Sequence, residues 1–379
     1  MSKANKNSSG ICPTMDDLEI FRKAASILES GMNIALVTVI SAEGSTPGKV
    51  GYKMLVWAED EKSVGTVGGG LTEAQMIEKA KSMLPQADSR VFRVDFGGDQ
   101  EDEKGICGGS AEFLIETFDK KNLPLFEELS TAVIKGEKGV LISIISPGKS
   151  PKKVFLKSMN QIVAEAGIKL PPEVVASIME LVAKEQPGKK LAGDGFELFI
   201  EAVTKQPIVI IFGAGHLSYH ISRYAKSVHF GVTVCDDRVQ YANKERFPDA
   251  DNIIVEDFEH VFDKIHIDDN SYIVIVTRGH QHDEMVLDRA VRTNAKYIGM
   301  IGSKRKTLTI LKKLNERGVP EEMLNKVYSP IGVSIGAVTP EEIALSIVCE
   351  LTKIRRLGHN PAIQHMTMSL SKWLHEEQL

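Results

Sequence analysis

The sequence predicts an α/β protein in which a C-terminal domain with a Rossmann-type parallel sheet follows an N-terminal domain of mixed α+β structure. Two observations favour the C-terminal sheet. Short apolar runs, such as residues 208–212 and 231–235, alternate with segments of helical periodicity, as expected of strands covered on both faces. The first run leads into the turn Gly213-Ala214-Gly215-His216, and a glycine turn between a strand and a helix is typical of Rossmann domains. Upstream, strands and helices are mixed without this regular alternation, which indicates α+β structure.

In the N-terminal part, glycine-rich turns separate the predicted elements. Apolar residues at helical spacing predict helices over residues 16–29, 72–83, 123–135 and 172–184. Apolar and β-branched runs predict strands over residues 33–41, 52–58, 90–96, 111–118, 139–145, 153–157 and 196–202. The middle segment, residues 120–195, is the least distinctive, and we expect it to be variable.

In the C-terminal part, strands and helices are expected in alternation. The strands are expected over residues 208–212, 231–235, 272–276 and 297–301, and the helices over residues 216–228, 283–293 and 340–355. Thr339, Pro340 and Glu342 suit the N-cap, N1 and N3 positions of the last of these helices. The predicted parts of the chain are a disordered tail over 1–14, an N-terminal domain over 15–205, the Rossmann-like domain over 206–357 and a helical tail over 358–379.

Composition excludes several classes of protein. The formal net charge of the 379 residues is −5, which argues against a nucleic-acid partner because such proteins carry a basic field. No apolar run approaches the roughly 20 residues that span a bilayer, and the first residues have no apolar leader, so we expect no membrane association. Four widely separated cysteines favour neither a disulfide framework nor a zinc site, which suggests the cytoplasm.

The turn after residues 208–212 is the first candidate ligand site. Gly213 permits a tight turn, Gly215 lets a phosphate approach the backbone, and Ala214 and His216 complete the helix start, whose free N–H groups favour anions. Ser218 replaces the third glycine of the common pattern. The alternative is a turn in an α/β domain that binds nothing.

Side chains at the end of the second strand belong to the same candidate site. Asp236 and Asp237, followed by Arg238, stand about 20 residues after the turn, where an acid bonds ribose hydroxyls in dinucleotide-binding proteins. Taken alone, these features predict NAD(P) or another nucleotide as the ligand.

A second polar loop follows the strand over residues 272–276. Arg278, His280, His282 and Asp283 could hold a metal, transfer protons, or donate hydrogen bonds to an anion. The alternative is a polar loop in which Asp283 caps the next helix.

Two glycine-containing turns are further candidates for anion binding. Gly302-Ser303 precedes three cationic residues and a helix, which suits either an anion site or a solvated basic helix start. In the N-terminal domain, Gly68-Gly69-Gly70 opens into a helix, although Glu73 in its first turn disfavours a neighbouring anion.

Cys107 lies between Ile106 and Gly108-Gly109 in a polar, glycine-rich loop. A loop thiol can be a soft-metal ligand or a nucleophile when its pKa is lowered, and the alternative is an inert buried thiol.

In their joint order, these motifs resemble the XdhC/CoxI family, the xanthine dehydrogenase accessory factors. The resemblance covers residues 15–118 and 196–356. The motifs that carry it are Gly44-Ser45-Thr46-Pro47, Gly65-Thr66-x-Gly68-Gly69-Gly70-x-x-Glu73, Cys107-Gly108-Gly109, Gly213-Ala214-Gly215-His216, Asp236-Asp237-Arg238, Glu245-Arg246-Phe247-Pro248, Gly279-His280-x-x-Asp283, Gly299-Met300-Ile301-Gly302-Ser303, Pro330-Ile331-Gly332 and Pro340-Glu341-Glu342-Ile343-Ala344.

The resemblance implies a cytoplasmic maturation factor that binds molybdenum cofactor, either molybdopterin or its cytosine dinucleotide. Such a factor supports sulfuration of the cofactor with a cysteine desulfurase and inserts it into a molybdenum hydroxylase such as xanthine dehydrogenase. It also implies a homodimer, a thiol of Cys107 near the molybdenum, and a phosphate pocket at Gly213 to His216. Two alternatives remain, an NAD(P)-dependent oxidoreductase with His280 as proton donor and a nucleotide sensor without activity.

Overall fold

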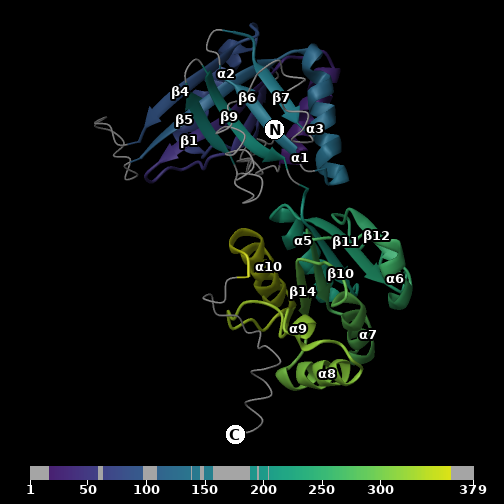
Figure 1. Ribbon diagram of the computed structural model, residues 1–379. Helices are drawn as coiled ribbons and strands as arrows, with labels where there is room; N and C mark the ends of the chain where they lie inside the picture. The colour runs from purple at the N-terminus through teal and green to yellow at the C-terminus, as the bar shows by residue number, and fades with distance from the viewer. Residues whose placement is uncertain are drawn as a thin grey trace, which may run out of the picture. The chain divides into compact units, whose positions relative to one another are not determined.

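The computed structural model describes residues 17–58, 63–96, 109–137, 139–145, 149–156, 188–193, 196–203 and 205–359. The chain forms two compact units, Met1–Lys205 and Gln206–Leu379 (Figure 1). The predicted tail over 1–14, the helix over 172–184 and nearly all of the helical tail over 358–379 lie outside the described residues. No helix in the described ranges is long and apolar enough to cross a membrane.

The described residues of the N-terminal unit form two antiparallel sheets. The helices in these ranges are α1 (Asp17–Glu29), α2 (Gly70–Met83) and α3 (Leu123–Lys135), with a short 3-10 helix at Lys120–Asn122. The first sheet has the order β3-β2-β1-β5-β4 and is made of β1 (Ile34–Glu43), β2 (Lys53–Trp57), β3 (Ser63–Gly65), β4 (Ser89–Asp95) and β5 (Ser110–Phe118). The second has the order β7-β6-β9-β8 and is made of β6 (Gly139–Ile144), β7 (Lys152–Leu156), β8 (Lys189–Gly193) and β9 (Phe196–Val203).

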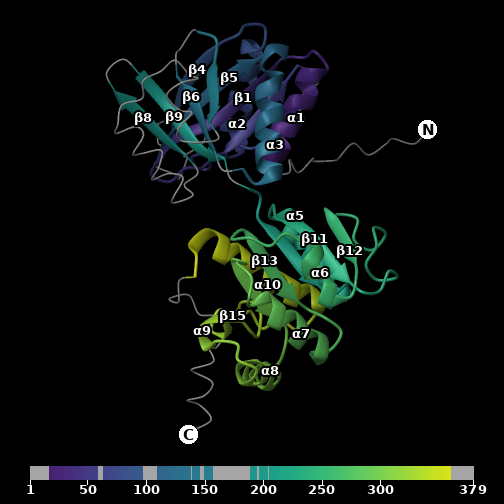
Figure 2. The same ribbon diagram turned by 45° about the vertical axis from the view of Figure 1, so that its right-hand side comes forward.

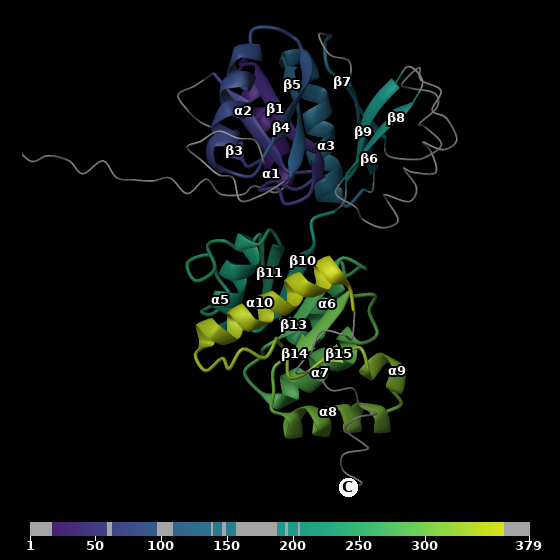
Figure 3. The ribbon, with the colours of Figure 1, turned by 90° about the vertical axis from the view of Figure 1, so that its left-hand side faces the viewer.

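The central strand β1 shows how this unit is layered. Ile34 and Leu36 pack with residues of α1 and α3, whereas Ala35 and Val37 pack with residues of α2. Since successive side chains of a strand point to opposite faces, this alternation places helices on both faces of the first sheet (Figure 3). The mixed α+β prediction for this part is confirmed.

Between residues 205 and 359, the C-terminal unit has one sheet of six parallel strands in the order β12-β11-β10-β13-β14-β15. The strands are β10 (Ile208–Phe212), β11 (Gly231–Asp236), β12 (Asn252–Val255), β13 (Ser271–Ile275), β14 (Tyr297–Met300) and β15 (Val327–Tyr328). The helices are α5 (His216–Ser227), α6 (Phe258–Lys264), α7 (His280–Ala290), α8 (Lys304–Glu316), α9 (Glu321–Leu324) and α10 (Pro340–Leu357). The predicted Rossmann-type sheet is confirmed.

Helices cover both faces of this sheet. Val209 and Ile211 of β10 pack in the core that includes α5 and α10, and Ile210 and Phe212 pack in the core that includes α6, α7 and α8. Helices α6, α7 and α8 lie in this order on one face of the sheet, and α7 contacts both α6 and α8 (Figure 2). Every side chain of β10 is thus in an apolar layer, which explains why its sequence is uniformly apolar.

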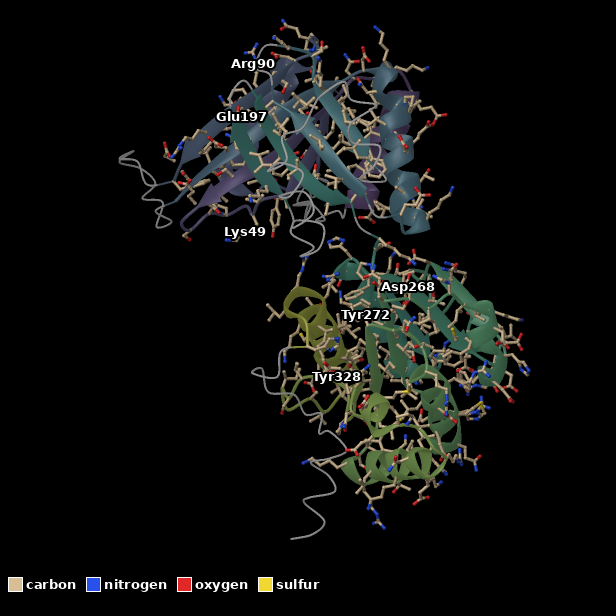
Figure 4. All side chains as sticks on the ribbon, in the orientation of Figure 1. Lys49, Arg90, Glu197, Asp268, Tyr272 and Tyr328 are labelled. Carbon is tan, nitrogen blue, oxygen red and sulfur yellow. The ribbon has the colours of Figure 1, made fainter. Side chains whose placement is uncertain are left out.

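Three tyrosines stack along β13, β14 and β15 under α10. The ring centroids of Tyr272 and Tyr297 lie 6.1 Å apart, and those of Tyr297 and Tyr328 lie 4.7 Å apart; Figure 4 labels the two outer rings. The Tyr297 hydroxyl donates to Glu350 of α10, and the same Glu350 oxygen accepts a hydrogen bond from Gly332 N at 2.9 Å. This stack ties the second half of the sheet to its covering helix.

Candidate functional site

The order of the parallel strands defines the candidate site. The chain runs from β10 outward to β11 and β12, and then returns to the other side of β10 to form β13, β14 and β15. The connections after β10 and β13 therefore lead away from each other, and open α/β sheets bind ligands at the carboxyl end of such a switch point. The Gly213 turn follows β10, and the Arg278 loop follows β13.

Two glycines at the switch point have no role that the fold requires. At Gly215 the backbone angle φ is −78°, at Gly279 it is −167°, and an added Cβ would meet no atom within 4 Å at either residue. Gly213 differs, because its φ is +111° and a Cβ would lie 2.4 Å from the Val276 carbonyl oxygen. The fold therefore requires Gly213, whereas Gly215 and Gly279 leave open space beside the backbone.

These open glycines are the N-caps of α5 and α7. Neither helix has a side-chain cap, whereas Asp257, Ser303 and Thr339 cap α6, α8 and α10. The first N–H groups of a helix lack intrahelical acceptors and carry a partial positive charge. Two uncapped helix starts at one switch point, each without a Cβ in the way, suit the close approach of an anionic group such as phosphate.

Asp236 does not present its carboxylate to a ligand. Its side chain is 1% exposed and accepts hydrogen bonds from Ala214 N at 2.8 Å, from Arg238 Nε at 2.8 Å and from Arg238 Nη2 at 3.0 Å. The prediction that Asp236 contacts a ribose therefore has no exposed carboxylate oxygen to support it in this geometry. Its carboxylate instead holds the glycine turn against the end of β11, and it uses the Ala214 N–H in doing so.

Asp237 is the more exposed acid of the pair. Its carboxylate makes a two-point ion pair with Arg278, with Nη1–Oδ1 at 2.5 Å and Nη2–Oδ2 at 2.8 Å. The hydrogen bonds from Arg278 lower the pKa of Asp237, and the same contact raises the pKa of Arg278. Since β10 lies between β11 and β13, this ion pair joins the two strands that flank the glycine turn.

Asp283 is also an internal residue. It is 0% exposed, and its Oδ1 accepts hydrogen bonds from Thr277 N at 3.2 Å and from Thr277 Oγ1 at 2.6 Å, while its Oδ2 contacts Lys306 Nζ. The N-cap of α7 is Gly279, so the alternative in which Asp283 caps this helix is wrong. Asp283 instead fixes the loop after β13 to α8.

The two histidines of the loop face different parts of the unit. His280 lines a cavity between α7 and α8, whereas the ring of His282 packs against Phe258 of α6 with centroids 5.4 Å apart. Within the described ranges, no three His, Cys, Asp or Glu side chains are grouped so that they could hold a metal. The geometry therefore gives no support to a metal site in this loop.

Gly302-Ser303 leads into α8, where the Ser303 hydroxyl accepts from Lys306 N at 3.3 Å. Ser303 also lines the cavity that His280 lines.

One neighbour of the site, Tyr241, was not singled out in the sequence. The guanidinium carbons of Arg238 and Arg246 lie 4.0 Å and 4.9 Å from the centroid of its ring. No local sequence pattern predicts these cation–π contacts.

The glycine loop of the N-terminal unit already holds an anion of the chain. One oxygen of Glu73 accepts hydrogen bonds from Thr66 Oγ1 at 2.5 Å, Val67 N at 3.0 Å and Gly69 N at 3.0 Å, and Thr66 Oγ1 accepts from Gly68 N at 3.1 Å. These donors are therefore not free to bind a ligand. An anion bound at this loop would have to compete with Thr66 Oγ1 for Gly68 N and with Glu73 for Gly69 N.

The cysteines divide into those inside and those outside the described residues. Cys107 and Cys12 lie outside them. Cys235 lies in β11 within the core, where burial raises the pKa of its thiol. Cys349 is exposed on α10.

Two family models match the chain. The XdhC Rossmann domain matches residues 209–351, and the XdhC and CoxI family matches residues 27–97. A crystal structure of a xanthine dehydrogenase from Bacillus halodurans is similar with a TM-score of 0.74 and 26% identity, over 92% of this chain and 98% of that one. The similarity thus extends over both units.

Three curated relatives are similar at lower identity. A protein of Bacillus subtilis (strain 168) that is named as a probable xanthine dehydrogenase subunit is 25% identical over 335 residues, 87% of this chain and 96% of the relative. The molybdenum cofactor insertion chaperone PaoD of Escherichia coli (strain K12) is 22% identical over 342 residues, 90% of each chain. The uncharacterized protein YqeB of the same strain is 23% identical over 340 residues, and the match spans 89% of this chain but 46% of YqeB.

Proposed function

We propose that this chain, which belongs to the XdhC and CoxI family, binds molybdenum cofactor and delivers it to a molybdenum hydroxylase of the xanthine dehydrogenase type. The names of its relatives support this proposal, since one is a molybdenum cofactor insertion chaperone and another is named for xanthine dehydrogenase. The cofactor is the cargo of the protein in this proposal, and the protein is a carrier.

The observation that carries the proposal is the pair of open glycines at the switch point. Gly215 and Gly279 begin two helices that lack side-chain caps, and neither the backbone conformation nor packing requires glycine at these residues. A phosphate-bearing cargo fits this arrangement, because its phosphate would accept hydrogen bonds from the helix N-termini. His216, exposed at the start of α5, and Arg278 of the loop after β13 complete the proposed site.

The buried state of Asp236 favours this cargo over NAD(P). In dinucleotide-binding dehydrogenases, the acid at the end of the second strand bonds the ribose hydroxyls. Here that carboxylate bonds Ala214 N and Arg238 instead. To bind the ribose of NAD(P), the Asp236 carboxylate would have to leave Ala214 N and Arg238. A cargo bound through its phosphate does not need this rearrangement.

The proposed site is tested by its effect on the bound cargo. The chain and its Gly215→Ala and Gly279→Ala variants would be purified anaerobically after co-expression with the cofactor pathway, and bound molybdenum and pterin would be measured. We expect at least a tenfold loss in the double variant, because the methyl groups occupy the space beside the helix starts. Wild-type pterin content in the double variant, or stoichiometric NADH in its place, would contradict the proposal.

Sulfuration of the cargo with a cysteine desulfurase, and homodimerisation, are finer proposals that rest on the family resemblance. In them, the thiol of Cys107 lies near the molybdenum. We predict that Cys107→Ala keeps the thermal stability of the protein but retains less sulfurated cofactor. Cyanide-releasable sulfur and bound molybdenum measure this loss, with Cys349→Ala as the control thiol. Unchanged sulfur in Cys107→Ala would remove the residue from the proposal.

A further inference from the structure

A cavity of about 290 Å³ lies between α7 and α8. Its lining includes His280, the first residue of α7, and Ser303, Arg305 and Lys306 at the start of α8. Ile310 of α8 adds an apolar wall. The volume is close to the lower bound for pockets that hold small molecules. The two helices lie next to each other on one face of the sheet (Figure 2).

Positive charge dominates the lining of this cavity. Arg305, Lys306 and Lys313 contribute three cations, and Glu284 contributes the one carboxylate. That carboxylate is already bound by Lys313 at 3.3 Å and by Arg317 at 2.7 Å. Lys306 is likewise paired with the buried carboxylate of Asp283, so Arg305 is the lining cation that has no carboxylate partner among the described residues.

Two of the lining side chains have unused donors. The guanidinium of Arg305 and the imidazole of His280 have no hydrogen-bond acceptor among the residues that the structure describes. Arg278 and Arg317, by contrast, each bind a carboxylate. A guanidinium presents up to five N–H donors in a planar fork, which matches two oxygens of a phosphate.

One wall of the cavity is held in place before any ligand binds. Lys306 Nζ contacts the buried carboxylate of Asp283 and lies 3.4 Å from the Ile301 carbonyl oxygen, and Asp283 is in turn bonded to Thr277. A site whose residues are already positioned loses less conformational entropy on binding.

We propose that this cavity is a second anion site, which binds the phosphate group of a small organic phosphate separately from the switch point. A phosphate group has three terminal oxygens, and the Arg305 guanidinium, the His280 imidazole and the Lys306 ammonium can each donate to one of them. The apolar wall at Ile310 accommodates the carbon skeleton of the ligand. The proposal does not depend on the proposed cargo, because the cradle at Gly215 and Gly279 offers backbone N–H groups, whereas this cavity offers the side chains of Arg305, His280 and Lys306.

Methyl NMR of the full chain separates the two sites. Ile310 δ1 methyl labelling reports on the cavity, and Ala214 methyl labelling reports on the glycine turn. Inorganic pyrophosphate is the probe, and malonate is the carboxylate comparator. We expect pyrophosphate to shift the Ile310 signal saturably and malonate to shift it at least tenfold more weakly.

Matched variants test which residues bind the probe. Arg305→Gln should raise the dissociation constant measured at Ile310 at least tenfold, whereas Lys304→Gln, which removes the same charge from the neighbouring residue outside the cavity, should change it less than twofold. Gly215→Val should leave the Ile310 response unchanged, since it blocks only the glycine turn. An Ile310 signal that pyrophosphate does not move, equal effects of the Arg305 and Lys304 changes, or loss of the response in Gly215→Val would each overturn the proposal. His280→Asn provides a second test, with an expected weakening of at least threefold.

Discussion

At the scale of single residues, the site depends on which polar groups are already used within the chain. Asp236 and Glu73 both bond backbone N–H groups of glycine-containing turns. Glu73 takes up three donors of its loop, whereas Asp236 takes one donor of the glycine turn, the Ala214 N–H; neither α2 nor α5 has a side-chain N-cap. Two turns of similar composition therefore differ in their capacity to bind an anion.

Gly213 and Gly215 differ in what an added methyl group would meet. We expect Gly213→Ala to lower the free energy of unfolding by about 2 kcal/mol or more, because φ is +111° and the Cβ would contact the Val276 carbonyl oxygen. Gly215→Ala should cost about 0.5 kcal/mol, the ordinary difference at an N-cap. Urea unfolding monitored by circular dichroism measures both, and equal losses in the two variants would contradict this prediction.

The tyrosine stack predicts a loss of stability at alkaline pH. Burial, followed by the nearby Glu350 charge, raises the pKa of Tyr297 well above 10 and that of Tyr328 to about 12. Below pH 10 both tyrosines are protonated in the folded and the unfolded chain, so they make no pH-dependent contribution. Above pH 10 the unfolded chain releases these protons and the folded chain keeps them, so stability falls as pH rises toward 12.

Thermal unfolding at pH 8, 9.5, 10.5 and 11 tests this expectation. The melting temperature should fall above pH 10, and Tyr328→Phe should make the fall shallower because it removes one of the two groups. The same slope in Tyr328→Phe and in the wild type would show that other groups cause the loss.

At the scale of secondary structure, segments with a clear helical period or a continuous apolar run were predicted well, and elements of two to four residues were not. The helix over 123–135 and the strand over 208–212 have the predicted bounds, and α2 begins at Gly70, two residues before its predicted start. The missed elements include β12, β15 and α9, which have two to four residues and are too short to show a period. Their partners in the sheet or the core, not their own sequence, stabilise them.

The cap of α10 was visible in the sequence and provides a test at this scale. Thr339 Oγ1 accepts from Glu342 N at 3.3 Å, and Glu342 Oε2 accepts from Thr339 N at 3.0 Å. We expect Thr339→Ala to lower the free energy of unfolding by about 1 kcal/mol, since it removes one half of this capping box. Thr339→Ser keeps the acceptor and should restore most of the loss; chemical denaturation compares the three proteins.

At the scale of the whole molecule, each unit has its own apolar cores. The two cores of the C-terminal unit consist of residues between 208 and 354, and those of the N-terminal unit consist of residues between 18 and 203. A domain with its own core can fold alone. The sequence predicted a domain boundary near residue 206, because continuously apolar strands that alternate with helices begin at residue 208.

We therefore expect residues 206–379 to fold without the N-terminal unit. The fragment should show a cooperative urea transition and a near-ultraviolet circular dichroism signal from its buried tyrosines. The intact chain, unfolded in parallel, is the reference. A fragment without a cooperative transition would mean that the C-terminal unit needs the rest of the chain.

Local sequence patterns were enough to predict the α/β class, the Rossmann-type sheet, the position of the glycine turn and the cap of α10. These follow from local patterns, because periodicity, turn residues and cap residues act over a few neighbours in the chain. The tertiary structure decided which donors and acceptors remain free. Asp236 turns inward, Arg278 pairs with Asp237 across β10, and His280 meets Arg305 in one cavity. Each of these contacts joins segments about 20 to 40 residues apart, so only the packed sheet could bring them together.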